Sequence, residues 1–150
     1  QIVIGLLMAA NGLTVVLFEM LLVHVAEKKW SMAITMFVGT IICGISYLLL
    51  GFTPGYFLLF FSMCLLSIGE ILVLPFMASI TSKRSGKTNK GAYMGLNGIA
   101  FSVSFIVAPI LGSQLAIDYG FNKLWIGTAV LLCICSVAFY MSVCHMERYK

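Results

Sequence analysis

Five long apolar runs, separated by short polar segments, constrain the fold of this chain more than any other feature of its sequence. A helix needs about 20 apolar residues to cross the hydrocarbon core of a bilayer, and each run reaches that length. Backbone polar groups in lipid must be satisfied within the segment, which favours helices. We therefore predict an all-α polytopic membrane protein with five transmembrane helices over residues 2–25, 31–51, 56–80, 91–117 and 124–143.

The low content of charged residues supports this fold class. Only 9% of the residues are charged and 61% are hydrophobic, whereas soluble domains carry about 25% charged residues. The chain has too few polar groups to cover a soluble globule, so a lipid bilayer is its predicted surrounding. Its basic residues form no stripe with interleaved aromatic side chains, so nucleic-acid binding is not expected.

The basic residues are distributed unequally between the two sides of the predicted membrane domain. If the five spans alternate in direction, the side that carries the N-terminus holds only one basic residue, Lys123. The opposite side holds all the other basic residues. Cytoplasmic loops of membrane proteins are enriched in Lys and Arg, so we expect the C-terminus to be cytoplasmic. The residues on that side are Lys28, Lys29, Lys83, Arg84, Lys87, Lys90, Arg148 and Lys150.

Glu70 is the most informative single residue, because it lies near the middle of the third apolar run. It precedes Ile80 by ten residues, which corresponds to about 15 Å of helix. A charge at that depth costs a few kcal/mol unless it faces protein or water. Two interpretations stay open: Glu70, with Ser67 on the same helix face, binds a proton or a substrate, or it is a structural acid hydrogen-bonded to a neighbouring helix.

Two other polar residues within the spans are weaker candidates for a binding site. Glu19 lies about six residues inside the end of the first run, and its short side chain cannot reach the headgroups as a lysine can. It either contributes to a proton or substrate site or pairs with another helix. Asn97 in the fourth run either contacts substrate or forms an interhelical hydrogen bond.

Pro75 and Pro109 interrupt the backbone hydrogen bonds of the third and fourth runs. A proline inside a helix removes one hydrogen bond and clashes with the carbonyl group four residues earlier. The resulting kinks either act as gates or are static bends. The carbonyl freed by Pro75 is close to Glu70 in sequence and is a further polar group that a substrate would meet.

Small residues recur along the fourth run at spacings of three and four. Such a stripe allows helices to approach closely in lipid. We therefore predict a helix-packing face, which would also suit a sliding interface. Its glycines are Gly91, Gly95, Gly98 and Gly112.

The sequence gives no indication of a metal, a cofactor or an enzyme active site. Cys133 and Cys135 are separated by one residue, which is neither a zinc nor a thioredoxin-like spacing. An enzyme site would need a nucleophile–base pair or a metal-binding set, and the chain offers only His24 and His145, both at predicted membrane edges. We expect no cofactor and no enzymatic activity.

The second and fifth runs contain no ionisable residue, as expected of helices that face lipid. They are three spans apart, which suggests a repeating unit of three helices whose outermost helix comes last. Repeats of this kind are common in secondary transporters.

The chain begins with Gln1 inside an apolar run, so we expect it to be a fragment of a longer polypeptide.

Several segments together resemble one family of transporters. They are Asn11–Phe18 (NGLTVVLF), Gly69–Pro75 (GEILVLP), Lys90–Leu96 (KGAYMGL), Ala108–Gly112 (APILG) and Asp118–Gly120 (DYG). Their order and spacing resemble helices eight to twelve in the C-terminal half of major facilitator superfamily transporters, and are most similar to the drug:proton antiporter-like branch.

This resemblance implies that the chain is part of a twelve-helix fold. It also implies that the whole transporter moves a small solute or drug by alternating access between two six-helix halves. It implies proton-coupled efflux across a bacterial inner membrane, with an N-terminal half of the same polypeptide as partner. It also implies that the helix with Glu70 faces the central cavity. The alternatives are a non-transporting membrane subunit that acts as a scaffold, and a membrane-embedded enzyme.

Overall fold

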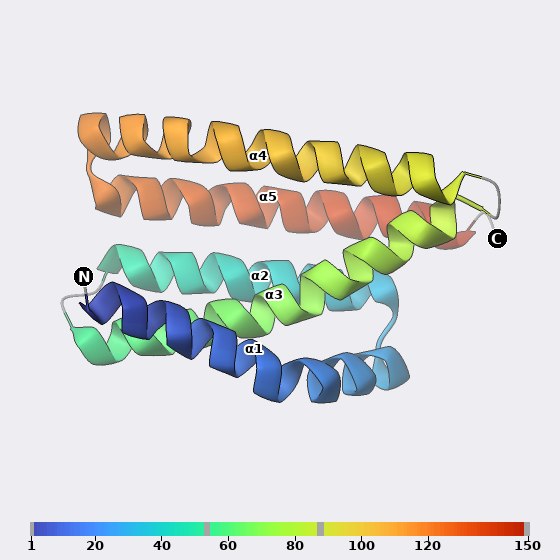
Figure 1. The fold of residues 1–150 in the computed structure, drawn as a ribbon, viewed down its shortest axis with the longest axis horizontal. Coiled ribbons are helices and arrows are strands. Elements are labelled where there is room, and N and C mark those ends of the chain that lie inside the picture. The colour runs from blue at the N-terminus through green and yellow to red at the C-terminus, as the bar shows by residue number, and fades with distance from the viewer. Residues whose placement is uncertain (1, 53–54, 87–88, 149–150) are drawn as a thin grey trace.

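The computed structural model consists of five long helices that run alternately in opposite directions (Figure 1). It describes residues 2–52, 55–86 and 89–148. All five helices are long and apolar enough to cross a membrane, which confirms the predicted all-α class. The helices are α1 (Ile2–Lys29), α2 (Met32–Phe52), α3 (Tyr56–Arg84), α4 (Lys90–Tyr119) and α5 (Phe121–Arg148).

The helices extend beyond the apolar runs predicted from the sequence. α1 continues to Lys29 and α3 continues to Arg84. Lys and Arg are good helix formers, and they interact favourably with the carbonyl end of a helix. The basic residues therefore prolong these helices past the membrane-spanning part instead of ending them.

The connections are correspondingly shorter. The expected turn over residues 118–123 is wrong in its extent, because only Gly120 separates α4 from α5. Gly120 has φ 82°, a backbone conformation that glycine adopts without a steric penalty. The other expected turn, Phe52–Gly55, includes residues 53 and 54, which lie outside the described part of the chain.

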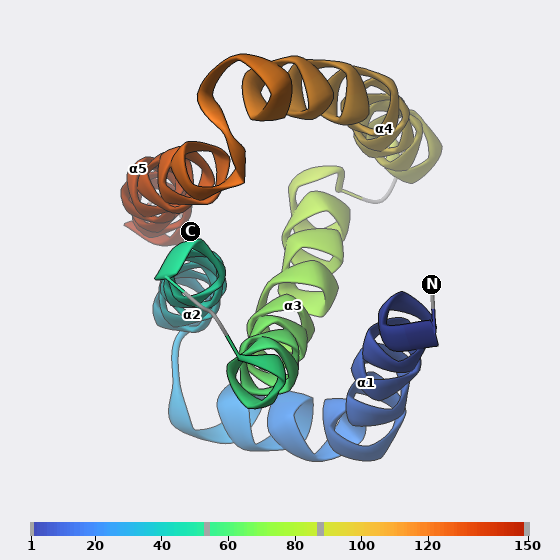
Figure 2. The ribbon, with the colours of Figure 1, turned by 90° about the vertical axis from the view of Figure 1, so that its left-hand side faces the viewer.

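α3 lies obliquely across the bundle, with α1 on one side and α2 on the other (Figures 1 and 2). α2 also packs along α5, and α4 contacts α5 and one end of α3. α2 is the most enclosed of the five helices in this part of the chain. From its lack of ionisable residues, α2 was expected to lie on the outside and face lipid. In the structure α3 and α5 both pack against α2, and this enclosure was not expected.

The interface between α2 and α3 combines two glycines with two serines. Gly39 and Gly69 are buried where the two helices meet. Two turns away, Ser46 Oγ donates to the Ser62 carbonyl at 2.8 Å, and Ser62 Oγ donates to the Ser46 carbonyl at 2.8 Å. These reciprocal bonds satisfy both buried hydroxyl groups within the apolar interior, so they fix the register of α3 on α2.

The interface between α2 and α5 is lined by aromatic pairs. The rings of Tyr47 and Trp125 stack with centroids 5.7 Å apart, and those of Phe37 and Tyr140 meet edge to face at 5.6 Å. Both separations lie in the range in which aromatic pairs attract, about 4.5–7 Å. A compact apolar cluster of Ala33, Met36, Leu72, Phe76 and Val143 closes the end of the bundle where α3 ends.

The alternating directions of the helices bring the basic helix ends together. α1 and α3 both end at the side where α4 begins and α5 ends (Figure 1). Their last turns contain Lys28, Lys29, Lys83 and Arg84. We call this the cationic end of the bundle; Lys123, in α5, belongs to the opposite end.

Candidate functional site

A polar cluster between α1 and α3 brings together Asn11, Ser67 and Glu70 inside two apolar helices. The fully buried Ser67 donates its hydroxyl hydrogen to Asn11 Oδ1 at 2.6 Å, and the Met63 carbonyl oxygen lies 2.8 Å from the same hydroxyl group. The side chain of Asn11 is also within hydrogen-bonding reach of the Glu70 carboxyl group. Because Asn11 accepts from Ser67 through its oxygen, its amide nitrogen is available to donate to Glu70.

Glu70 lies at the edge of a small cavity of about 70 Å³ between the same two helices. Glu19 and Val15 line it from α1, and Ile71 and Pro75 line it from α3. Both acids predicted from the sequence therefore belong to one groove. Pro75 has no N–H to donate to the carbonyl group of Ile71, which leaves that oxygen as a further acceptor beside the carboxyl groups.

The charge of this groove has one sign. In the described part of the chain, neither Glu19 nor Glu70 forms an ion pair with a basic side chain. Two ionised carboxyl groups lining one small cavity repel each other, and a bound proton or cation removes that repulsion. The groove is lined by two carboxyl groups, and the amide of Asn11 lies beside Glu70 outside this lining. Its charge favours a bound proton or cation.

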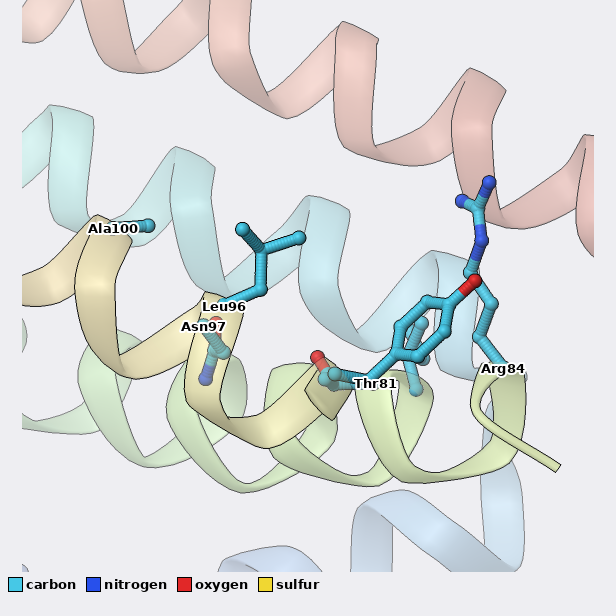
Figure 3. Close-up of a pocket in the computed structure, with 7 residues that line it drawn as sticks. Thr81, Arg84, Leu96, Asn97 and Ala100 are labelled. Atoms are coloured by element: carbon cyan, nitrogen blue, oxygen red, sulfur yellow. The ribbon is translucent and has the colours of Figure 1, made fainter. Parts of the chain in front are cut away.

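Asn97 lies elsewhere in the structure. It lines a separate cavity of about 540 Å³ between α3 and α4, together with Thr81, Arg84 and Tyr93 (Figure 3). Thr81 follows Glu70 by eleven residues, which corresponds to about 16 Å along α3. The structure thus brings Glu70, Ser67 and Glu19 together and places Asn97 toward the cationic end.

Both prolines lie inside helices that continue through them. Pro75 lines the groove of Glu70, whereas Pro109 lines a cavity of about 370 Å³ between α4 and the start of α5, together with Gly112. The role of either residue in gating stays a prediction. Pro75 has the closer connection with the candidate site, because its helix presents both Glu70 and Ser67.

The predicted glycine stripe of α4 faces no other described helix. A Cβ atom added at any of its four glycines would meet no described atom within 4 Å; they are Gly91, Gly95, Gly98 and Gly112. Packing through this stripe therefore stays a prediction about a partner other than the described helices.

Two features of the interior were missed from the sequence. Asn11 was not included among the binding residues, although an amide in the middle of an apolar run needs a partner just as Glu70 does. The contact between Gly39 and Gly69 was also missed, because these glycines belong to different helices. A signal was present in α2, where Thr35, Gly39 and Cys43 recur at a spacing of four. Among the described residues, no group of three or more His, Cys, Asp or Glu side chains could hold a metal ion.

Comparison with known proteins identifies similar sequences over most of the chain. The profile of the Major Facilitator Superfamily matches residues 1–147. An MFS-type transporter of Bacillus subtilis (strain 168), YttB, is 31% identical over 132 residues, which cover 87% of this chain and 33% of the relative. A Na⁺, Li⁺, K⁺/H⁺ antiporter of Planococcus maritimus is 25% identical over 109 residues, covering 71% of this chain and 25% of the relative. No solved structure matches.

Proposed function

Because this chain belongs to the major facilitator superfamily, we propose that it is part of a proton-coupled secondary transporter in which the groove of Glu70 binds the exchanged ions. The chain spans about a third or less of the length of the relatives it matches. The transporter that we propose therefore includes an N-terminal half outside this chain. Substrate binds between the two halves, which open alternately to either side of the membrane.

The single observation that carries this proposal is the cluster of Asn11, Ser67 and Glu70 beside Glu19, inside otherwise apolar helices. A carboxyl group at this depth is stable when it is protonated or when it faces a cation or water. Ser67 holds Asn11 in place, and Asn11 contacts the carboxyl group. Release of the proton from Glu70 creates a negative site, which then attracts a cation; release of the cation leaves the carboxylate free to bind a proton from the solution on the other side of the membrane.

The chemistry of the groove supports a positively charged substrate. Both of its ionisable side chains are acids, and the carbonyl oxygen of Ile71, to which Pro75 has no N–H to donate, is a further acceptor. Carboxyl, amide and carbonyl oxygens are the ligands that small hard cations prefer. One relative is named as an antiporter of Na⁺, Li⁺ and K⁺ against H⁺. We propose cation/proton exchange for this protein, with monovalent metal ions or organic cations as substrates.

We further propose that the cationic end of the bundle faces the cytoplasm, with the protein in a bacterial plasma membrane. Lys28, Lys29, Lys83 and Arg84 lie in the last turns of α1 and α3 at this end. An excess of Lys and Arg in short loops determines the orientation of most membrane proteins. Both relatives are bacterial, which supports the choice of membrane.

The experiment measures cation-dependent proton movement in inverted membrane vesicles that contain the intact transporter. A pH gradient is established, and a fluorescent pH probe follows its collapse when Na⁺, K⁺, Li⁺ or an organic cation is added. We expect the wild-type protein to collapse the gradient and Glu70→Gln to slow the collapse by at least about tenfold, the effect of losing one charged contact. Glu27→Gln is the matched control, because Glu27 is exposed in the last turn of α1.

Unchanged exchange and an unchanged pH profile in Glu70→Gln would remove Glu70 from the mechanism. If the wild-type protein moves no cation but moves a neutral or anionic solute, cation exchange is wrong while transport stands. If purified protein in liposomes moves no solute but stays bound to other membrane proteins, the scaffold alternative is correct.

A further inference from the structure

The larger cavity between α3 and α4 is separate from the groove of Glu70 and has a different chemistry. Its volume of about 540 Å³ lies within the range of small-molecule sites, roughly 300–1,000 Å³. Tyr93, Leu96, Asn97 and Ala100 recur at spacings of three and four on α4, so they form one face of that helix. Ile80, Thr81 and Arg84 line the cavity from α3.

The cavity becomes less polar from the cationic end toward the middle of α4. Arg84 is in the last turn of α3, and Tyr93 is in the first turn of α4 (Figure 3 shows the side chain of Arg84). Asn97 lies one turn deeper, and Ala100 lies about 10 Å along the helix from Tyr93. A charged group therefore lines the cavity at the end of the bundle and small apolar groups line it further in.

Donors at the charged end suit an anion. The guanidinium group of Arg84 has five N–H donors, and the contact found for it is a weak one to Met146 Sδ at 4.0 Å. In the described part of the chain, neither the Tyr93 hydroxyl nor the Asn97 amide forms a hydrogen bond. Thr81 donates its hydroxyl hydrogen to the Met77 carbonyl at 2.9 Å, so it is not a donor for a ligand.

The apolar side of the cavity continues along α4. Val103 and Val107 follow Ala100 at spacings of three and seven residues, and both are exposed. They extend the apolar face of α4 toward the middle of the bilayer. A ligand with a negative head and a hydrocarbon chain would therefore contact favourable groups along its whole length, whereas a free anion would use only the donors.

From this arrangement we infer that the cavity binds an anionic phospholipid, with its phosphate at Arg84 and its acyl chain along Leu96, Ala100 and Val103. Basic pockets between transmembrane helices are typical sites for anionic lipid headgroups. The neighbouring Lys83 and Lys90, which flank the connection between α3 and α4, raise the local positive charge further. This inference does not depend on the substrate of the transporter.

The test measures lipid retained by the intact protein. Protein is purified from detergent micelles that contain equal amounts of phosphatidylglycerol and phosphatidylcholine with the same acyl chains, and bound lipid is quantified by mass spectrometry. We expect the wild-type protein to retain phosphatidylglycerol preferentially. Arg84→Gln should reduce this retention about tenfold, the effect of losing charge-assisted hydrogen bonds, whereas Lys28→Gln, which removes the same charge outside the cavity, should leave it unchanged.

A second pair of variants tests the cavity without changing its charge. Ala100→Trp fills the space occupied by the first acyl methylene groups and should also reduce retention of phosphatidylglycerol. Ile99→Trp introduces the same side chain at an exposed position outside the residues that line the cavity and should have no effect. Each variant is compared only after size-exclusion chromatography shows a single folded species.

Several results would overturn the inference. Equal losses in Arg84→Gln and Lys28→Gln would mean that the lipid responds to overall charge. Equal retention of the two lipids, or unchanged retention in a folded Ala100→Trp variant, would exclude this cavity. Protection of Arg84 from chemical modification by inorganic phosphate, with no lipid retained, would identify a site for a free anion. Protection of Arg84 by another part of the polypeptide would assign the cavity to an interface within the protein.

Discussion

Gly39 and Gly69 face each other so closely that neither position has room for a side chain. A Cβ atom on Gly69 would lie 2.8 Å from the carbonyl oxygen of Gly39, and one on Gly39 would lie 3.0 Å from the carbonyl oxygen of Gly69. Cys43 and Leu72 close the remaining space around them. Small residues are the usual means of close helix packing in lipid, and here one glycine from each helix is sufficient.

Gly69→Ala should destabilise the protein, because the added methyl group meets backbone atoms that cannot move aside. Overpacking of this kind costs about 1–3 kcal/mol. The measurement is thermal unfolding of the purified intact protein in detergent, followed by the loss of monodisperse material. Gly127→Ala is the control, since a Cβ atom there would meet no described atom within 4 Å and Gly127 lies outside the predicted packing stripe of α4; equal losses in both variants would contradict the close contact.

The paired serines of α2 and α3 should behave as one coupled unit. Ser46→Ala and Ser62→Ala each remove one of the reciprocal bonds to a backbone carbonyl. Because the two hydroxyl oxygens also lie 3.1 Å apart, each single variant also removes the contact between them, and the double variant should cost less than the sum of the two. The coupling expected for hydrogen bonds between membrane helices averages about 0.6 kcal/mol and reaches about 1.7 kcal/mol. A double-mutant cycle of unfolding free energies measures it, and strict additivity would show that the hydroxyl groups do not interact.

Asn11→Leu should impair exchange nearly as much as Glu70→Gln, provided that the proposed site is correct. The leucine fills a similar volume but leaves Ser67 and Glu70 without the amide that lies between them. Losing a hydrogen bond to a charged group corresponds to about a tenfold change. The vesicle assay should show a shifted pH profile as well as a lower rate, which a purely structural defect would not produce.

The control for Asn11→Leu is Ser104→Ala, because Ser104 is exposed and bonds only to Ala100 of its own helix at 2.9 Å. Wild-type exchange in Asn11→Leu would show that Glu70 acts without this partner.

Lys83 and Lys123 should be accessible from opposite sides of the membrane. They lie at opposite ends of the bundle, in α3 and α5. Cysteines introduced at these positions, in a protein whose native cysteines, including the five of this chain, have been replaced, are treated with an impermeant thiol reagent in intact cells and in inverted vesicles. We expect Lys123→Cys to react in intact cells and Lys83→Cys only in inverted vesicles; reaction of both from one side would refute the topology.

The number and type of the helices could be predicted because length and hydropathy alone determine them in a membrane protein. It could also be predicted that Ser67 and Glu70 lie on the same face of α3, because residues three positions apart in a helix share a face. The partnership of Asn11 with these residues required the register of α1 on α3. That register depends on contacts between residues that are 56 positions apart in the sequence, which no local pattern reveals.

The small residues illustrate the same limit in the opposite direction. The stripe of α4, with Gly95 and Gly98, is obvious in the sequence, yet the described helices do not pack on it. The close contact described above is instead made between Gly39 of α2 and Gly69 of α3. The cavity that Asn97 shares with Thr81 and Arg84 was not predictable either, because it depends on how α4 packs along α3.

The one-residue connection at Gly120 restricts how α4 moves relative to α5. With no spare chain between the helices, α4 cannot slide lengthwise by even one helical turn, which is about 5.4 Å, without unwinding one of them. Its opposite end is joined to α3 by the longer segment 85–89. We therefore expect α4 to move relative to α5 by rotation about Gly120, with displacements that grow with distance from it and are largest near Lys90.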